Sequence, residues 1–296
     1  MLISTMTMAF AEKYGYLEAV RRLSKLGFDC LDLTLTHFRE KADDPLLSDD
    51  YKAIAEEIRK TADECGISFN QCHAPYYFAV EMSRIYSDNA MYEKIIGTTL
   101  RAIEVAGIVG AKTVVIHPAH FTNYNVSNRY ETLSYNLNFY DKFAAAAKAA
   151  GVKIAVENMW QSNIYTKAIV ADVCSNPYEL KEYVDALNEK YGGGFTACLD
   201  IGHCALTGAN PADAIKILGD RLGALHVHDN DARADQHLMP GCGVIDFTQV
   251  IKALKEVGYK GEFTYEADKY IKQHDVTEYE AAATRLYEKA KELINM

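Results

Sequence analysis

One unit, repeated eight times along the chain, restricts the fold more than any other feature of this sequence. Each unit begins with a short apolar run, continues through a polar loop, and ends where apolar residues recur every three or four positions. The apolar run is typical of a buried strand, and the periodic stretch of an amphipathic helix. Strands are predicted at 1–8, 28–35, 68–74, 113–118, 153–158, 195–202, 222–228 and 262–267.

The helices between these strands complete the pattern. They are predicted at 16–26, 51–65, 92–107, 133–150, 178–191, 212–218, 247–257 and 278–294. Regular alternation of strand and helix predicts parallel βαβ units, and eight such units favour a closed (β/α)8 barrel over an open sheet. The 296 residues are close to the length that one such barrel commonly uses. No linker or shift in composition divides the chain, so we expect a single domain, 1–296.

The composition restricts the partners and the compartment. A formal net charge of −10 disfavours a bulk attraction to nucleic acid or to an anionic membrane, although it does not exclude a local site. No apolar run approaches the about 20 residues of a membrane span, and the first residues lack the basic region of a signal peptide. The seven cysteines are scattered, without CxxC spacing. We therefore expect a cytoplasmic protein with free thiols.

Candidate metal ligands follow most of the predicted strands, at or just after the end of each. In a barrel of parallel strands these ends converge on one rim, which is where active sites form. A rim of carboxylates and imidazoles indicates a metal-dependent site. The candidates are His73, His117, Glu157, Asp200, His203, His226, Asp235, His237 and Glu266.

Four of these candidates come from consecutive strands, the fifth to the eighth. They are Glu157, Asp200, His226 and Glu266. A carboxylate at the end of an apolar strand needs a cation or hydrogen-bond donors. Three carboxylates and one imidazole suit Mn²⁺ or Mg²⁺, and Co²⁺ or Zn²⁺ is also compatible. The alternative is that each is an ordinary buried polar group, satisfied by hydrogen bonds.

The other candidates have two interpretations. They either take part directly, as ligands of a second metal or as substrate contacts, or they hold the first ligands in position. These are His73, His117, His203, Asp235 and His237. We expect His228 to be a structural residue. If His226 points inward, His228 should point away from the rim, because alternate strand residues face opposite sides. Trp160 and the TyrTyrPhe run at 76–78 follow ligand-bearing strands. They could form an apolar wall for a sugar ring or belong to ordinary packing.

Several segments together resemble the xylose isomerase-like TIM-barrel superfamily, over essentially the whole chain. They are HisAlaPro (73–75), ValIleHisPro (115–118), ValGluAsn (156–158), LeuAspIleGlyHis (199–203), HisValHisAspAsnAsp (226–231) and HisLeuMetProGlyCysGlyValIleAspPhe (237–247). That superfamily includes sugar and sugar-phosphate isomerases and epimerases, inosose enzymes and endonuclease IV. The resemblance implies one metal held by Glu157, Asp200, His226 and Glu266, with substrate contacts from His203 and Arg233.

The resemblance also implies a function. It favours a metal-dependent sugar or sugar-phosphate isomerase or epimerase, working by proton transfer through a metal-stabilised enediolate, with Glu157 and Glu266 as the acid/base pair. A small sugar is then the expected partner, and a homo-oligomer is compatible with this class.

Three alternatives stay open. An inosose dehydratase-type lyase would use the same enolate. An endonuclease IV-like multi-zinc phosphodiesterase would use all nine candidates, but the loop segments of that nuclease are absent here. A non-catalytic sugar-binding barrel is disfavoured because the ligand set is complete.

Overall fold

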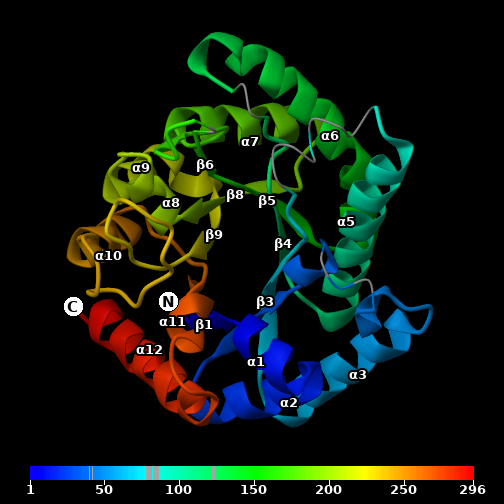
Figure 1. Ribbon diagram of the computed structural model, residues 1–296, viewed down its shortest axis with the longest axis vertical. Coiled ribbons are helices and arrows are strands. Elements are labelled where there is room, and N and C mark those ends of the chain that lie inside the picture. The colour runs from blue at the N-terminus through cyan, green and yellow to red at the C-terminus, as the bar shows by residue number, and fades with distance from the viewer. Residues whose placement is uncertain (40, 42, 78–81, 83–86, 122–123, 164) are drawn as a thin grey trace.

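The strands form one parallel barrel surrounded by helices (Figure 1). The computed structural model describes residues 1–296 except 40, 42, 78–81, 83–86, 122–123 and 164. The barrel strands are β1 (Ile3–Met6), β2 (Cys30–Thr34), β3 (Ser68–His73), β4 (Thr113–Ile116), β5 (Lys153–Glu157), β8 (Phe195–Asp200), β9 (Leu222–His226) and β10 (Phe263–Tyr265). Their order in the sheet is β10-β1-β2-β3-β4-β5-β8-β9. The predicted (β/α)8 fold is confirmed.

The barrel closes between β9 and β10, at the ends of the sheet order. Val227 forms a parallel bridge with Tyr265. The amide of Val227 donates to the carbonyl oxygen of Thr264, and the amide of Glu266 donates to that of Val227. These bonds hold the ends of β9 and β10 together, and with them the segments that carry His226 and Glu266.

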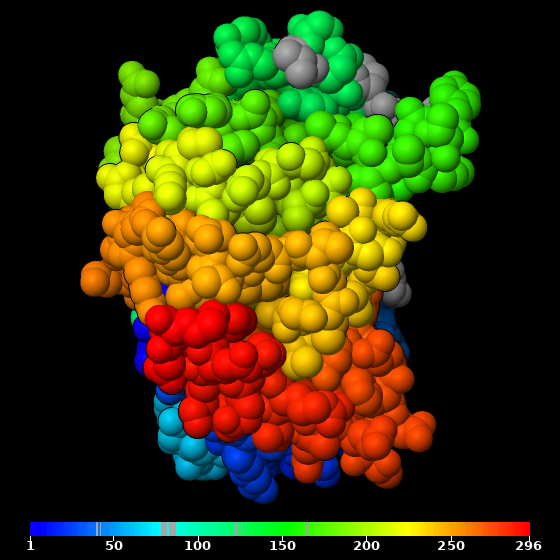
Figure 2. Space-filling model, turned by 90° about the vertical axis from the view of Figure 1, so that its left-hand side faces the viewer, coloured from blue at the N-terminus to red at the C-terminus, as the bar shows by residue number. Residues whose placement is uncertain are grey.

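The eight predicted helices are present, with ends shifted by up to a few residues. They are α2 (Tyr16–Leu23), α3 (Tyr51–Glu64), α5 (Asn89–Val109), α6 (Arg129–Ala150), α7 (Pro177–Tyr191), α9 (Pro211–Leu218), α10 (Phe247–Glu256) and α12 (Tyr279–Ile294). Figure 2 shows α10 and α12 side by side on the outside of the barrel. None of the described helices is long and apolar enough to cross a membrane.

Several shorter elements lie in the connections, and the sequence analysis did not separate them. The helices are α1 (Met8–Tyr14), α8 (Ile201–Leu206) and α11 (Asp268–Lys272), and β6 (Trp160–Ser162) pairs antiparallel with β7 (Ile169–Ala171) after β5. The 3-10 turns are η1 (Ser24–Leu26), η2 (Thr36–Arg39), η3 (Pro45–Leu47), η4 (Val126–Asn128), η5 (Gly219–Arg221) and η6 (Val276–Glu278). The first predicted strand was too long, because β1 ends at Met6 and α1 begins at Met8.

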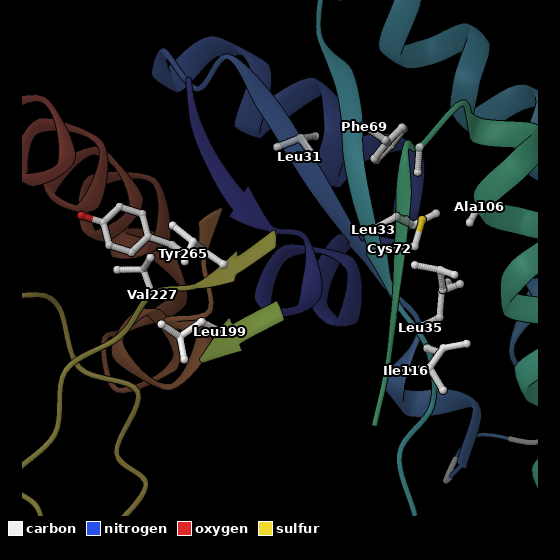
Figure 3. Close-up of a cluster of buried hydrophobic side chains, with 14 of the residues drawn as sticks. Leu31, Leu33, Leu35, Phe69, Cys72, Ala106, Ile116, Leu199, Val227 and Tyr265 are labelled. Atoms are coloured by element: carbon white, nitrogen blue, oxygen red, sulfur yellow. The ribbon is translucent and has the colours of Figure 1, made fainter. Parts of the chain in front are cut away.

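The main core lies between the strands and the helices. Leu31, Leu33 and Leu35, alternate residues of β2 and its end, pack in one buried cluster with Cys72 of β3 and Ala106 of α5 (Figure 3). Because alternate strand residues face opposite sides, the residues between these leucines face the barrel interior.

Inside the barrel, a separate layer of small side chains supports the rim. It consists of Val115, Ala155, Cys198 and Ala224. Residues two positions apart on a strand face the same side. Two positions further along these four chain segments stand His117, Glu157, Asp200 and His226. The alternation along the strands therefore directs these four side chains into the mouth of the barrel.

Candidate metal centre and substrate cavity

Glu157, at the end of β5, is surrounded by imidazoles. Its Oε1 lies 3.1 Å from Nδ1 of His226, and its Oε2 lies 3.0 Å from Nε2 of His117. Nε2 of His73 is 3.6 Å from the same Oε2. Burial raises the pKa of Glu157, but His226 and His117 outweigh this effect and hold the pKa well below its ordinary value. Glu157 is therefore a buried anion.

Glu266, just after β10, approaches the same histidine as Glu157. Its Oε2 lies 3.1 Å from Nδ1 of His226, the nitrogen that also contacts Glu157. On the other side of the ring, Nε2 of His226 lies 3.7 Å from Asp32 of β2. The structure thus brings three of the four predicted ligands into direct contact. We call His73, His117, Glu157, His226 and Glu266 the first group.

Asp200, the fourth predicted ligand, pairs with a different histidine. Its Oδ1 lies 3.1 Å from Nε2 of His228, which is 3.7 Å from Oδ1 of Asp235. The other oxygen of Asp235 is 2.8 Å from Nε2 of His237. Nδ1 of His203 lies 3.9 Å from Asp200. We call these five residues the second group.

The two groups adjoin through His203. Its Nδ1 lies 3.6 Å from Oε1 of Glu157 in the first group, in addition to its approach to Asp200 in the second. All nine candidate ligands of the sequence analysis therefore lie in two connected clusters at the mouth of the barrel.

The expectation that His228 points away from the rim was wrong. Its side chain is fully buried, contacts Asp200, and stacks on the ring of His237 with 4.2 Å between the ring centroids. The reason is geometric, because residues two apart on an extended segment face the same side. If His226 points inward, His228 does too.

Three imidazoles are oriented by backbone carbonyl oxygens. A carbonyl oxygen only accepts, so each ring carries its hydrogen on Nδ1 and donates it. Nε2 is then the nitrogen of each ring that remains to face a metal or a carboxylate. The pairs are His73 with Ala74 at 2.7 Å, His203 with Asn158 at 3.0 Å, and His237 with Glu266 at 2.7 Å.

Asn158 has a positioning role that the sequence analysis missed. Its Oδ1 accepts from the amide of Asp200 at 2.7 Å, and its Nδ2 donates to the carbonyl oxygen of Asp200 at 2.9 Å. The side chain thereby ties the end of β5 to the end of β8. The available signal was its place directly after Glu157 in ValGluAsn.

Asp229 holds the loop that carries Asp235 and His237, and it too was missed. Its carboxylate accepts from the amides of Gly241 at 2.9 Å, Gly243 at 2.8 Å and Ile245 at 3.2 Å. Three backbone donors on one carboxylate fix the path of this loop over the barrel mouth. The glycines of the ProGlyCysGly segment fit this role, because a Cβ on Gly243 would lie 2.3 Å from Oδ1 of Asp229.

The donor set fits a divalent cation. Oε2 of Glu157, Nε2 of His117 and Oε2 of Glu266 are buried without a hydrogen-bond partner among the described residues. Oε2 of Glu157 and Nε2 of His117 are only 3.0 Å apart, but they do not form a hydrogen bond with each other. Unpaired buried polar atoms are costly, and a cation shared between them removes the cost. In the second group, Oδ1 of Asp235 is unpaired in the same way.

A cavity of about 700 Å³ adjoins both groups. Its polar lining includes His73, His117, His203, Asp235, His237 and Glu266. Tyr76 and Trp160 contribute aromatic walls, whereas Tyr77 is buried and bonds Thr98. Phe78 lies outside the described residues. Arg233, an expected substrate contact, is exposed and is not among the described residues that line the cavity.

His120 also lines the cavity but has both ring nitrogens engaged. Nδ1 lies 2.8 Å from Oδ2 of Asp172, and Nε2 lies 2.9 Å from the carbonyl oxygen of Tyr77. Burial lowers the pKa of His120, but the bond to Asp172 outweighs it and raises the pKa above its ordinary value. His120 therefore joins three loops around the cavity.

The metal-free protein is expected to lose stability as the pH rises above neutrality. Burial lowers the pKa of His228, but Asp200 and Asp235 outweigh it and raise the pKa from 6.5 to about 9. A raised folded-state pKa gives stability that is complete below pH 6.5 and lost as the pH rises through about 9. The melting temperature in chelator should fall over this range, and fall less in His228→Asn. A melting temperature that rises with pH would contradict this pairing.

Gly202, in the first turn of α8, is required for the position of His228. A Cβ there would lie 1.9 Å from Cε1 of the His228 ring. We expect Gly202→Ala to lower stability by about 1–3 kcal/mol through overpacking. Gly97→Ala is the matched control, since Gly97 lies inside α5 with open space around it and should be neutral or stabilising. Equal melting temperatures for Gly202→Ala and the unsubstituted protein would show that His228 can move freely.

Residues 20–289 match the family model described as xylose isomerase-like TIM barrel. The chain belongs to this family. An uncharacterized relative from Methanocaldococcus jannaschii is 33% identical over 168 residues, which are 56% of this chain and 54% of the relative. The chain thus spans about half the length of that relative.

Two solved structures are similar to this chain in fold. A D-psicose 3-epimerase, determined in the presence of D-fructose, has a TM-score of 0.74 at 16% identity and covers 100% of both chains. The IolI protein with a bound zinc atom has a TM-score of 0.75 at 18% identity, covering 100% of this chain and 98% of the other. At these identities the likeness concerns the fold.

Proposed function

We propose that the protein is a divalent-metal-dependent sugar isomerase or epimerase that moves a proton next to a carbonyl group. The observation that carries this proposal is the position of Glu266. Its carboxylate contacts His226 of the first group, and Glu266 also lines the 700 Å³ cavity, so it can contact a bound substrate. The D-psicose 3-epimerase that shares this barrel supports the choice of a sugar.

The residues that would hold the metal are those of the first group. Glu157, His226 and Glu266 converge, and His73 and His117 face Glu157 from the other side. Three imidazoles favour Mn²⁺, Co²⁺ or Zn²⁺ over Mg²⁺. When bound, the metal polarises the substrate carbonyl and makes the adjacent C–H more acidic.

The two carboxylates differ in their access to substrate. Glu266 lines the cavity and is the group that exchanges a proton with the substrate carbon. Glu157 is fully buried and stays charged beside its imidazoles, where it holds His226 and His117 in place. Proton removal is the first step of an isomerisation, an epimerisation or a dehydration, and analysis of the products separates these three.

The charges around the cavity favour an unphosphorylated sugar. Among the described residues that line it, the two lysines already have carboxylate partners, with Lys269 3.2 Å from Asp235 and Lys272 2.8 Å from Glu12. A phosphate would have to displace one of these carboxylates. The rings of Trp160 and Tyr76 offer apolar surface for the face of a sugar.

Solvent exchange tests the proposed function. In D2O, the metal-loaded enzyme should place deuterium on a single carbon adjacent to the carbonyl of a ketose substrate, measured by NMR on a panel of free ketoses. The chelated protein is the control and should show no exchange. Interconversion of sugars without incorporation of deuterium would indicate hydride transfer and would exclude proton removal by a carboxylate base.

The second group favours one further candidate, a multi-metal phosphodiesterase. It places Asp200, His203, Asp235 and His237 beside the first group, so more than one ion could be held. Metal counting and an abasic-DNA cleavage assay separate the candidates. One ion without cleavage supports the sugar enzyme, whereas two or three retained zinc ions with cleavage overturn it. Several ions without cleavage would give a sugar enzyme with a second metal.

A further inference from the structure

His120 is bonded to both chain segments that carry an aromatic wall of the 700 Å³ cavity. These walls are Tyr76, which follows β3, and Trp160, which belongs to β6. The proposed function gives His120 no part in the chemistry, because both of its ring nitrogens are engaged in hydrogen bonds. A histidine in this position can act only through the segments that it holds.

The Nε2 side of the His120 ring holds the segment of Tyr76. Nε2 donates to the carbonyl oxygen of Tyr77 at 2.9 Å, since a carbonyl oxygen only accepts. Tyr76 is the residue before it, and its ring stacks on the ring of His117 with 5.4 Å between the centroids. The bond therefore fixes the chain one residue after the first aromatic wall.

The Nδ1 side of the His120 ring holds the hairpin of Trp160. Nδ1 lies 2.8 Å from Oδ2 of Asp172, which follows the last residue of β7. That last residue, Ala171, pairs with Trp160 in the β6–β7 hairpin. Asp172 is fully buried, and its other carboxylate oxygen accepts from the amide of Val173 at 2.7 Å. Asp172 therefore has a fixed position, and through it His120 holds the second aromatic wall.

One rigid ring thus joins the two walls. The two nitrogens of an imidazole have a fixed spacing, and His120 uses both, so the two segments cannot move apart without breaking a hydrogen bond. His120 is only 8% exposed, and a buried hydrogen bond is costly to leave unmade. Aromatic rings offer large apolar contact surfaces, and the contact that they make with a bound sugar depends on where they stand.

We propose that His120 is a positioning residue that sets the separation of Tyr76 and Trp160, and with it the width of the substrate that the cavity accepts. This inference rests on the proposed function, in which the two rings contact a sugar. His120 itself neither exchanges a proton with the substrate nor binds the metal. Loss of either bond should therefore weaken substrate binding and raise KM, and it should leave the proton-transfer step and kcat unchanged.

Two variants of His120 break one bond each. The side-chain amide of glutamine places its donor nitrogen near the position of Nε2, and that of asparagine places it near the position of Nδ1. His120→Gln should therefore keep the bond to Tyr77 and lose the bond to Asp172. His120→Asn should keep the bond to Asp172 and lose the bond to Tyr77. The circular dichroism spectrum checks that both variants fold.

Two spectroscopic signals of the full chain report the walls separately and need no substrate. Trp160 is the single tryptophan of the sequence and its ring lies 6.3 Å from that of His203, so its fluorescence reports the position of the hairpin. The ring signals of His117 in an NMR spectrum report the position of Tyr76, which stacks on it. His120→Gln should change the Trp160 emission and keep the His117 signals, and His120→Asn should do the opposite.

Kinetics with a ketose that the enzyme converts test the consequence for the substrate. Both variants should raise KM by about 2- to 10-fold, the contribution of one aromatic contact, with kcat unchanged. His274→Gln is the matched control, since Nδ1 of His274 also bonds a backbone carbonyl oxygen, that of Tyr270 at 2.8 Å, and His274 is not among the described residues that line the cavity. It should leave both signals and KM unchanged.

The proposal is overturned if the Trp160 emission is unchanged in His120→Gln and the His117 signals are unchanged in His120→Asn, because the walls would then not depend on His120. A KM equal to that of the unsubstituted protein in both variants would overturn it as well. If the unsubstituted protein converts no ketose, the proposed function fails, and the two spectroscopic signals still decide whether His120 positions the walls.

Discussion

Replacing Glu157 by glutamine should lower the affinity for divalent metal by more than about a hundredfold and abolish turnover. Loss of a group that only supports a ligand costs about 10- to 100-fold in affinity, and Glu157 is proposed as a ligand itself. Its carboxylate lies within 3.6 Å of ring nitrogens of His73, His117, His203 and His226. An amide in its place removes the charged carboxylate that faces the rings of His73 and His117.

A calorimetric titration with the metal measures the change in affinity, and the far-ultraviolet circular dichroism spectrum checks the fold. Glu179→Gln is the control, since Glu179 is also a buried carboxylate but bonds Tyr124 and the amide of Cys174 instead. That variant should keep its metal affinity. If Glu157→Gln binds metal as tightly as the unsubstituted protein, Glu157 is not a ligand.

The barrel and the ring of ligands could be predicted because both follow from alternation along the strands. The continuous apolar runs identify strands covered on both sides, and the polar residue that ends each run must then lie at the rim. Ala155 beneath Glu157 and Ala224 beneath His226 show this pattern directly. The fold follows from such local rules, without knowledge of any contact between distant residues.

The pairing within the rim could not be predicted in the same way. Asp200 contacts His228 rather than joining the contacts among Glu157, His226 and Glu266, and this depends on a loop path that the sequence does not specify. That path is fixed by backbone donors to Asp229. Asp229 lies in the HisValHisAspAsnAsp segment (226–231), but the segment does not show which amides its carboxylate will accept from.

The β6–β7 hairpin escaped prediction for a different reason. Its strands are only three residues long, at Trp160–Ser162 and Ile169–Ala171, which is too short for a periodic pattern to be distinguished from a polar loop.

Replacing Glu266 by glutamine should separate proton transfer from metal binding. We expect turnover to fall by about 10²–10⁴-fold, the usual contribution of a general acid or base. The loss of metal affinity should be smaller than in Glu157→Gln. The reason is that Glu266 contacts the first group through His226 and is 12% exposed at the cavity, whereas Glu157 is fully buried among several imidazoles.

Deuterium exchange into the ketose and metal titration of Glu266→Gln measure the two effects independently. Glu262→Gln is the matched control, since Glu262 lies at the opposite end of the same strand and pairs with Lys112 at 3.2 Å. It should exchange and bind metal normally. Full turnover in Glu266→Gln would remove this carboxylate from the chemistry. A loss of metal affinity equal to that of Glu157→Gln would instead show that Glu266 acts mainly as a ligand. The proton would then have to be transferred by another residue that lines the cavity, such as His203 or Asp235 of the second group.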